Sequence, residues 1–585
     1  MHFKIPTLSK TQRGFSLVEV IVAASLLVII FGGLFLGFKY MIELVSTTKV
    51  QSGALAVATD EMEYLRSLSY NELGTVGGVP AGNIPQNSTT TLNGIVYTQE
   101  ILIQYVDDPA DGLEGADENS ITTDYKQVKV KASWDIKGVP GFISLVSNII
   151  PAGMETTVGG GTIKVNVFDS KVSPLSGIPV RFVNNTSSTT IDTVRYTNSS
   201  GVAYLSGAPA AADYQIFVSD TGYSTDSTYL ATTANPNPNT PPVAVLENQV
   251  STMNFQIDKL SDLTITTVAP STDETFSDNF ADVSKLSSLS NTVVSSGSLM
   301  LAGGPGAYAV NGLAVSNPVA PGTIKEWQAV EFSATTSSAT GIKIYIMSDH
   351  GAGLTLVSDT DLPGNSSGFS NSPIDLSSLS VTSYPNLSLQ AELSSSDVND
   401  TPSINDWSLS YIKSQSPIAG VAVSVLGNKT IGTNEGVPVL KHEYSGSTNA
   451  SGQINLSDIE YDRYAIVING SSYDVSEACP LVPYSLSPDT TGSIKMTLVP
   501  KQNNSLRVSV VDSAGQPIPN ADVHLKNTGI DELESSSLCG QVYFGNSLYE
   551  SSDYTLSVGA NGYLSENLIG LSISSSSNIS VILSQ

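Results

Sequence analysis

Cationic residues are scarce in this chain of 585 residues, which has 26 Lys and Arg against 54 Asp and Glu. The resulting net charge of -28 repels a phosphate backbone, and no cluster of basic residues offsets it, which argues against nucleic acid as a partner. Charged residues of both signs make up only 14% of the chain. The abundant Val, Ile, Tyr, Ser, Thr, Asn and Gly therefore predict short β-strands separated by turns.

Signatures of catalysis are missing as well. The sequence has no phosphate-binding loop, zinc signature or nucleophile elbow, and its four histidines are far apart with no ligand spacing. Ser348-Asp349-His350 combines the residue types of a hydrolytic triad. Neighbouring residues of one loop cannot adopt triad geometry by themselves, however. We therefore expect no enzymatic activity and no cofactor.

One long apolar run, Phe15 to Phe38, follows a short basic leader and is long enough to cross a membrane. Glu19 is the only ionisable residue inside it, and a carboxylate in hydrocarbon requires a partner. A conventional secretory signal is cut after its apolar segment. Here the expected cut lies before it, between Gly14 and Phe15, which leaves the run on the mature chain with its new amine about one helical turn from Glu19.

Gly14, Phe15 and Glu19 resemble the class III signal of type IV prepilins and pseudopilins. The resemblance implies that a prepilin peptidase cuts after Gly14 and methylates Phe15, and that Glu19 neutralises the N-terminal amine of a neighbouring pilin subunit. It also implies a single-pass membrane precursor, with its N-terminus cytoplasmic before processing, that later reaches a pilus or the cell surface. The alternative is a simple signal anchor with a chance glutamate.

Helical spacing of apolar residues continues beyond the membrane run and predicts one helix from Phe15 to about Ser69. A helix of this size is about 80 Å long, more than a bilayer needs, so its second half must pack on something. The following segment alternates as an antiparallel sheet, with strands at Val96 to Tyr105 and Tyr125 to Trp134. Residues 39–152 resemble the helix continuation and globular head of minor pilins.

An acidic loop separates these two strands. Asp107, Asp108, Asp111 and Asp117 are the candidate calcium ligands, because carboxylates dense in a glycine-containing loop suit a hard cation. The loop lacks EF-hand spacing. A solvated hairpin tip is therefore the favoured interpretation.

Three later segments repeat one pattern of short strands, Pro-containing steps, Gly turns and paired tyrosines: residues 160–260, 414–500 and 501–585. They resemble carboxypeptidase regulatory-like and Cna-B-type β-sandwiches, of the immunoglobulin or prealbumin-like kind. Some relatives carry a Lys–Asn isopeptide bond. Lys164 and Asn254 lie on roughly suitable strands, but the acidic catalyst is missing and Arg507 replaces lysine in the third copy, so we do not expect the bond.

Cys479 and Cys539 are the only cysteines of the chain. An extracytoplasmic location permits a disulfide between them. The bond would clamp the last two repeats and contribute about 4 kcal/mol in the chain-entropy model. Two free buried thiols are the alternative.

Residues 262–413 differ from the repeats and resemble jelly-roll modules, related in shape to carbohydrate-binding domains. Trp327 and Trp407 are candidates for stacking on sugar rings, although such aromatics more often fill a sandwich core. The ligand of this region is left open between a surface glycan, a host or cell ligand, and none.

The predicted fold is thus mainly β: a leader at 1–14, an assembly helix at 15–38, a small α+β head, tandem sandwiches and one jelly roll. The predicted function is a structural or adhesive minor pilin-like subunit. The alternatives are a type II secretion pseudopilin and a pilin-anchored surface carbohydrate-binding protein or hydrolase.

Overall fold

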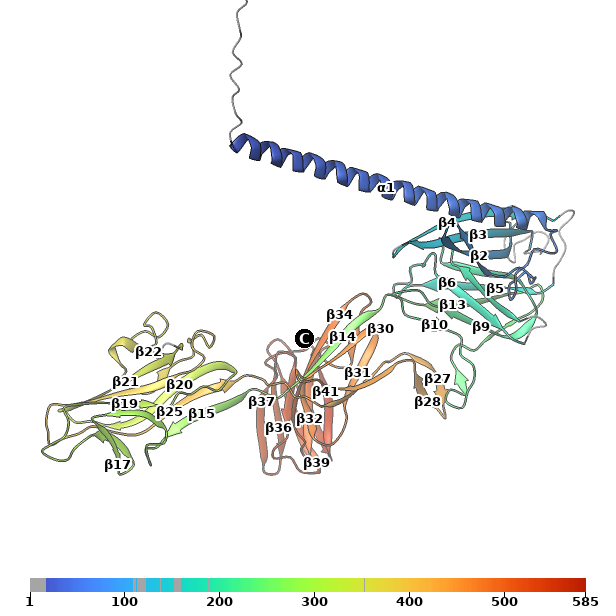
Figure 1. Ribbon diagram of the computed structural model, residues 1–585. Coiled ribbons are helices and arrows are strands. Elements are labelled where there is room, and N and C mark those ends of the chain that lie inside the picture. The colour runs from blue at the N-terminus through green and yellow to red at the C-terminus, as the bar shows by residue number, and fades with distance from the viewer. Residues whose placement is uncertain are drawn as a thin grey trace, which may run out of the picture. The chain divides into compact units, whose positions relative to one another are not determined.

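The computed structural model describes residues 17–108, 112, 123–136, 138–151, 159–186, 190–351 and 353–585. These residues form two compact units. Unit 1 contains the described residues up to Leu260 together with Thr430–Leu440, and unit 2 contains Ser261–Lys429 and Lys441–Gln585. The predicted fold class is confirmed, because one long helix precedes a series of β-sheets (Figure 1).

Helix α1 spans Leu17–Ser67, and its second half packs on a four-stranded antiparallel sheet. The sheet is formed in the order β1 (Asn87–Leu92), β2 (Ile95–Val106), β3 (Tyr125–Ile136) and β4 (Val139–Ile149). The helix residues buried against it recur every three or four positions: Val50, Ala54, Val57, Ala58, Met62 and Leu65. This spacing places them on one face, as the sequence predicts.

The first sandwich completes most of unit 1. One sheet has the order β13 (Val250–Gln256), β5 (Gly161–Phe168), β8 (Val202–Ala208). The other contains β10 (Asp226–Ser227), β9 (Ala211–Val218), β6 (Pro179–Asn184) and β7 (Ile191–Tyr196), with β12 (Val243–Val245) on β9. A separate small sheet joins β11 (Asn237–Pro238) to the hairpin of β27 (Thr430–Asn434) and β28 (Val437–Leu440).

The second and third sandwiches belong to unit 2. The second has sheets β30-β14-β34-β32 and β29-β26-β31-β33, formed by β14 (Ser261–Val268), β26 (Ala422–Leu426), β29 (Glu443–Ser447), β30 (Gln453–Ile459), β31 (Asp462–Ile468), β32 (Tyr473–Cys479), β33 (Tyr484–Leu486) and β34 (Thr491–Pro500). The third has sheets β38-β35-β41 and β37-β36-β39-β40, formed by β35 (Ser505–Asp512), β36 (Asp522–Asn527), β37 (Ile530–Ser535), β38 (Gln541–Phe544), β39 (Ser551–Gly559), β40 (Glu566–Ile573) and β41 (Ser576–Leu583).

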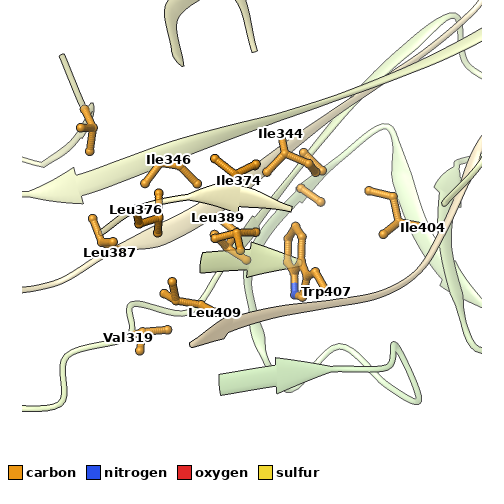
Figure 2. Packing of buried hydrophobic residues seen from close by; sticks show 14 of the residues in the cluster. Val319, Ile344, Ile346, Ile374, Leu376, Leu387, Leu389, Ile404, Trp407 and Leu409 are labelled. Carbon is orange, nitrogen blue, oxygen red and sulfur yellow. The ribbon is translucent and has the colours of Figure 1, made fainter. Parts of the chain in front are cut away.

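The jelly roll packs two antiparallel sheets around one core. The first sheet contains β15 (Thr272–Asp278), β17 (Thr292–Ser295), β18 (Ser298–Leu301), β20 (Ile324–Thr335), β23 (Ile374–Asp375) and β25 (Ser403–Lys413). The second has the order β16 (Leu286–Ser290), β19 (Asn311–Ser316), β24 (Ser388–Ser395), β21 (Thr340–Asp349), β22 (Leu354–Leu356). Figure 2 shows Trp407 between aliphatic side chains of this core, among them Ile344, Leu389 and Ile404.

The sheet topology corrects one predicted boundary. The sequence assigns residue 262 onward to the jelly roll, whereas β14 pairs with β30 and β34 of the second sandwich. In each sandwich the opening strand pairs in parallel with the last one: β5 with β13, β14 with β34, β35 with β41. The second copy therefore opens with β14. Its opening strand was missed because the whole jelly roll follows it in the chain.

All three copies have an equivalent β-bridge after the opening strand, and in the second copy this bridge spans the inserted jelly roll. The last residue of the opening strand, or the one before it, bridges a proline: Phe168 to Pro174, Val268 to Pro417 and Val511 to Pro517. In the first and third copies this bridge closes a short turn. In the second copy it closes over residues 269–416, so the jelly roll takes the place of a turn.

A glycine turn packs against each opening strand. Gly201, Gly452 and Gly540 have φ of +73°, +70° and +68°. Each accepts a hydrogen bond at its carbonyl oxygen from the opening strand, through the amides of Val167, Thr267 and Val510. A Cβ on Gly452 would lie 2.4 Å from the Thr267 carbonyl oxygen. Both the backbone conformation and the close approach require glycine here.

Gly452→Ala tests the assignment of β14 to the second sandwich. We expect a loss of more than about 2 kcal/mol in the free energy of unfolding, because the left-handed conformation alone costs about 1–2 kcal/mol and the methyl group also displaces β14. Gly420→Ala is the matched control, since Gly420 has φ +74° in the same sandwich with nothing within 4 Å of its Cβ position. Urea denaturation measures both variants, and equal losses would contradict the packing of the turn on β14.

Candidate functional site

The processing residues predicted from the sequence lie at the start of α1. Gly14 and Phe15 fall outside the described residues, and Glu19 lies in the first turn of the helix, where its backbone is helical. The described side chains from Leu17 to Lys49 are all exposed, although most of them are apolar up to Val45. The helix is long and apolar enough to cross a membrane, with a mean hydropathy of 2.7 in its most apolar window. Such a surface requires lipid or other apolar helices to cover it.

Burial of α1 begins abruptly at Val50, where the helix meets the head. The hydroxyl of Tyr97 donates a hydrogen bond of 3.0 Å to the Val50 carbonyl oxygen, and Tyr97 itself is buried. Gly53 makes room for this contact, because a Cβ there would lie 2.4 Å from the Tyr97 hydroxyl. The head therefore contacts the helix from Val50 onward. The helix residues before Val50 are not covered by any other described residue of the chain.

Two buried cations hold the loop that follows α1. Lys126 of β3 donates hydrogen bonds from Nζ to the carbonyl oxygens of Tyr70 and Leu73, at 2.7 and 2.8 Å. Arg195 of β7 donates from Nη2 to the Val79 carbonyl oxygen at 2.7 Å, which ties the first sandwich to the head. Burial lowers the pKa of Lys126 to about 8 and that of Arg195 to about 10. Both side chains act as structural donors within unit 1.

The predicted calcium ligands are only partly described. Asp107 and Asp108 follow β2, where the Asp108 amide donates to a carboxylate oxygen of Asp124. Asp111 and Asp117 lie outside the described residues. In the part of the chain that the structure describes, no group of three His, Cys, Asp or Glu side chains is placed to hold a metal ion. A calcium site in this loop stays a prediction.

Trp327 and Trp407 do not reach the surface of the jelly roll. Both indoles are 0% exposed and belong to its core, and Trp327 donates from Nε1 to the Tyr384 carbonyl oxygen at 2.8 Å. The favoured interpretation, that these aromatic side chains fill the sandwich core, is therefore confirmed, and the alternative that they stack on sugar rings is wrong.

The side chains of Ser348, Asp349 and His350 contact different neighbours. The buried Ser348 hydroxyl donates to the Asn386 carbonyl oxygen at 2.8 Å. The Asp349 carboxylate accepts from the amides of Gly351 and Gly353, which closes the turn after β21. The His350 ring packs beside Tyr384, with 5.7 Å between ring centroids. The three side chains thus have separate structural partners.

Lys164 and Asn254 do not share a site. Lys164 alternates with the buried Ile163 and Val165, so its side chain lies on the outer face of β5, beside the Tyr204 ring. Asn254 is exposed and lies opposite Asn166, whose Nδ2 donates to the Asn254 Oδ1 at 2.7 Å. An isopeptide bond needs the amine beside the amide. This register separates them by two positions.

The two cysteines join the last two sandwiches. Cys479 at the end of β32 and Cys539 before β38 form a disulfide, with 5.6 Å between their Cα atoms. Beside it, the Gln541 side chain donates to the Ala478 carbonyl oxygen and accepts from the Ala478 amide, both at 2.9 Å. One covalent bond and one amide pair therefore fix β32 against the third sandwich.

Two buried carboxylates in unit 2 had no sequence signal. Glu460 is 2% exposed and pairs with Lys429, Lys441 and His442, at 2.6, 2.8 and 2.7 Å. Burial alone would raise the pKa of Glu460, but the hydrogen bond from His442 and the two lysines lower it to about 2. Glu460 thus joins Lys429 to Lys441 and His442, which are separated in the sequence by residues 430–440. Asp474, the second carboxylate, lies between the second and third sandwiches.

The comparisons with known proteins bear on the N-terminus. A family model described as the prokaryotic N-terminal methylation motif matches residues 9–35, which confirms the class III signal. No curated protein matches the chain.

Several solved structures also match parts of the chain. They include the TIE protein of Bacillus anthracis (12% identity, 85% of this chain and 72% of that chain, TM-score 0.16), the major pilin subunit BcpA of Bacillus cereus (10%, 73% and 99%, 0.14) and the minor pilin GBS52 of Streptococcus agalactiae (10%, 30% and 86%, 0.12). These identities and TM-scores are too low to carry an argument about function. The motif and the apolar helix together fit a membrane-anchored precursor of a pilin-like surface subunit.

Lys126→Met tests the buried amine of the head. The folded-state pKa of about 8 lies below the value of 10.5 for a free lysine, so the unfolded chain binds more protons between these values and stability rises with pH there. We expect the wild-type free energy of unfolding, minus that of the variant, to increase by on the order of 1–3 kcal/mol across this window and to be flat below it.

Urea denaturation at a series of pH values measures this difference. Lys129→Met is the control, because Lys129 lies on the same strand with its side chain on the opposite face of the sheet. Identical pH profiles for the two variants would contradict the assignment.

Proposed function

We propose that this chain is a minor pilin-like subunit of a type IV pilus or a related filament, with a structural or adhesive role. One observation carries the proposal: the methylation motif opens a helix whose first half is apolar and exposed while its second half is buried in a small head. A helix of this design serves as an anchor before assembly and as the filament core afterwards. Lipid and neighbouring helices would cover the same surface in turn.

Assembly in this proposal depends on Glu19 and on the amine created by cleavage before Phe15. A carboxylate among packed apolar helices is costly without a partner, and a neighbouring N-terminal amine supplies the opposite charge. In a low-dielectric surrounding this attraction is strong and selects one register between helices. Prepilin peptidase and other pilin subunits are the partners that this mechanism requires.

The size of the chain favours a rare position in the filament. Residues 160–585 follow the head and form three sandwiches and a jelly roll. Such mass would crowd a lattice in which every subunit carried it, so a minor or terminal subunit fits better than a major one. A type II secretion pseudopilin has the same signal and is the second candidate.

We also propose that the chain is not an enzyme. The Ser348-Asp349-His350 side chains are engaged with backbone groups and a neighbouring ring, and Trp327 and Trp407 are core residues. These placements support the proposal, since none of these side chains is free to act as a nucleophilic triad or as a sugar-stacking surface. Adhesion through other surfaces of the β domains remains part of the proposal.

Gly14→Val tests processing. We expect the variant to keep its leader, because a branched side chain at the cleavage position blocks the peptidase, whereas the wild type begins at a methylated Phe15. Intact-mass measurement of the membrane-extracted protein separates the two forms. Gly37→Val is the control, since Gly37 has open space around it within the same helix. A variant at Gly14 with the wild-type mature N-terminus would refute the peptidase assignment.

Glu19→Ala tests assembly. We expect normal membrane insertion but an incorporation into filaments that falls by about tenfold or more, since an unpaired amine among apolar helices costs several kcal/mol. Quantitative immunoblotting of sheared filaments and membranes measures the ratio. Glu43→Ala is the matched control, because Glu43 is exposed on the same helix beside Lys39, at 4.0 Å. Wild-type incorporation of the Glu19 variant would rule out the pairing role.

A further inference from the structure

A cavity of about 260 Å³ lies between the second and third sandwiches. Its walls come from β31, β32, β34 and the β34–β35 linker on one side, and from β35, β38 and β41 on the other. The disulfide and the Gln541 pair described above hold these walls together. The cavity is therefore a built feature of this junction rather than a gap between loosely connected domains.

Arg507 lines this cavity without a counter-ion. It alternates with the buried Leu506 and Val508, which places its side chain on the outer face of β35, between Tyr543 and Asn578 on the neighbouring strands. Its Nε and one terminal nitrogen, Nη1, are buried and have no hydrogen-bond partner in the described part of the chain. Burial lowers the pKa of Arg507, yet a guanidinium stays protonated in proteins. Arg507 as a whole is half-buried, but two buried donor atoms of a charged group require acceptors.

Among the described residues, Asp474 is the only carboxylate that lines the cavity, and its oxygens already accept hydrogen bonds. Its Oδ1 accepts from Lys501 Nζ and the Ser576 hydroxyl, at 2.6 and 2.7 Å. Its Oδ2 accepts from the Gln502 amide, the Ser505 hydroxyl and the Tyr543 hydroxyl. A carboxylate offers about four lone-pair sites, so these five donors saturate it. Lys501 balances its charge, which leaves the charge of Arg507 unbalanced.

The fold does not need a cation at this position. Arg507 lies three residues before Val510, and the equivalent residue of the second copy is Thr264, three residues before Thr267. Thr264 is uncharged and hydrogen-bonds Asn455 across the sheet. The first copy has Lys164 at this position, three residues before Val167, so a cation is present in two copies and absent from the second. Lys164 lies over the Tyr204 ring, whereas Arg507 faces a cavity with two buried nitrogen atoms that lack an acceptor, which a ligand would supply.

We propose that this cavity binds a carboxylate-bearing ligand, whose oxygens accept hydrogen bonds from the Arg507 guanidinium. One uncompensated positive charge matches a monoanion, and a planar carboxylate fits the fork of an arginine. Val475 and Met496 add apolar surface for the rest of the ligand. An acidic sugar and a peptide C-terminus both supply this group. The site is independent of filament assembly and goes beyond the function proposed above.

Isothermal titration of the purified full-length protein in detergent tests the site with two probes. Glucuronate represents acidic sugars, and N-acetyl-alanine represents a peptide C-terminus. We expect at least one of them to bind the wild type and Arg507→Met to weaken that binding by about tenfold or more, as the loss of a charge-assisted pair predicts. Arg463→Met is the matched control, because Arg463 is exposed on β31 and does not line the cavity. Titrations with sodium chloride and with inorganic phosphate at equal ionic strength show whether binding requires a carboxylate or only negative charge.

Thermal unfolding without ligand separates binding from folding. Removal of an unbalanced buried charge leaves the unfolding temperature of Arg507→Met unchanged or higher, whereas removal of a structural cation lowers it. Four outcomes would overturn the proposal: neither carboxylate binds, binding survives in Arg507→Met, only phosphate binds, or Arg507→Met unfolds at a lower temperature. Preference for one carboxylate probe identifies the source of the ligand.

Discussion

The architecture of the chain depends on helix α1 being buried in its second half and exposed in its first half. From Val50 onward α1 contributes its apolar face to the core of the head, and before Val50 its described side chains are exposed, with no other element of the described chain covering them. The Tyr97 hydrogen bond to Val50 marks this change within a single turn. Exposed apolar surface on this scale is stable only in lipid or among other helices. The fold of the head therefore fixes which part of the helix is left to lipid and to filament partners.

The rest of the chain repeats one hydrogen-bonded frame three times. An opening strand, a bridge to proline and a glycine turn recur with the same partners in each sandwich. A buried tyrosine closes each copy by donating to a carbonyl oxygen four or five residues earlier: Tyr214, Tyr464 and Tyr554. The second copy keeps these contacts although the jelly roll replaces the turn that its proline bridge closes, so the frame tolerates insertion. The second copy uses this freedom twice, for the jelly roll and for the β27–β28 hairpin.

Hydrophobic periodicity and turn residues were enough to predict the helix and many strands, but not every strand pairing or side-chain contact. The α1 helix and the strands β2 and β3 follow from apolar spacing, and the glycine turns follow from residues that tolerate positive φ. The β14 strand was misassigned because its partners lie beyond an inserted domain. Glu460, Asp474 and Arg507 were missed for a related reason: each is an ordinary polar residue in a strand or loop, and only the tertiary fold buries it. For Trp327 and Trp407 the sequence left two roles open, core packing and sugar stacking, because a strand pattern does not identify which face is buried.

The junction between the second and third sandwiches is constrained in three independent ways. The disulfide is covalent, the Gln541 pair is neutral, and the Asp474 network is ionic. Burial alone would raise the pKa of Asp474, but hydrogen bonds from Lys501, Ser576 and their neighbours lower it to about 2. Since this value lies below that of a free carboxyl, the stabilisation is complete above an ordinary aspartate pKa and is lost only as the pH falls through about 2. Acid strong enough to break the network is thus far from neutral conditions. The hydrogen bonds of Asp474, which shape the wall of the cavity that Arg507 also lines, are accordingly kept at neutral pH.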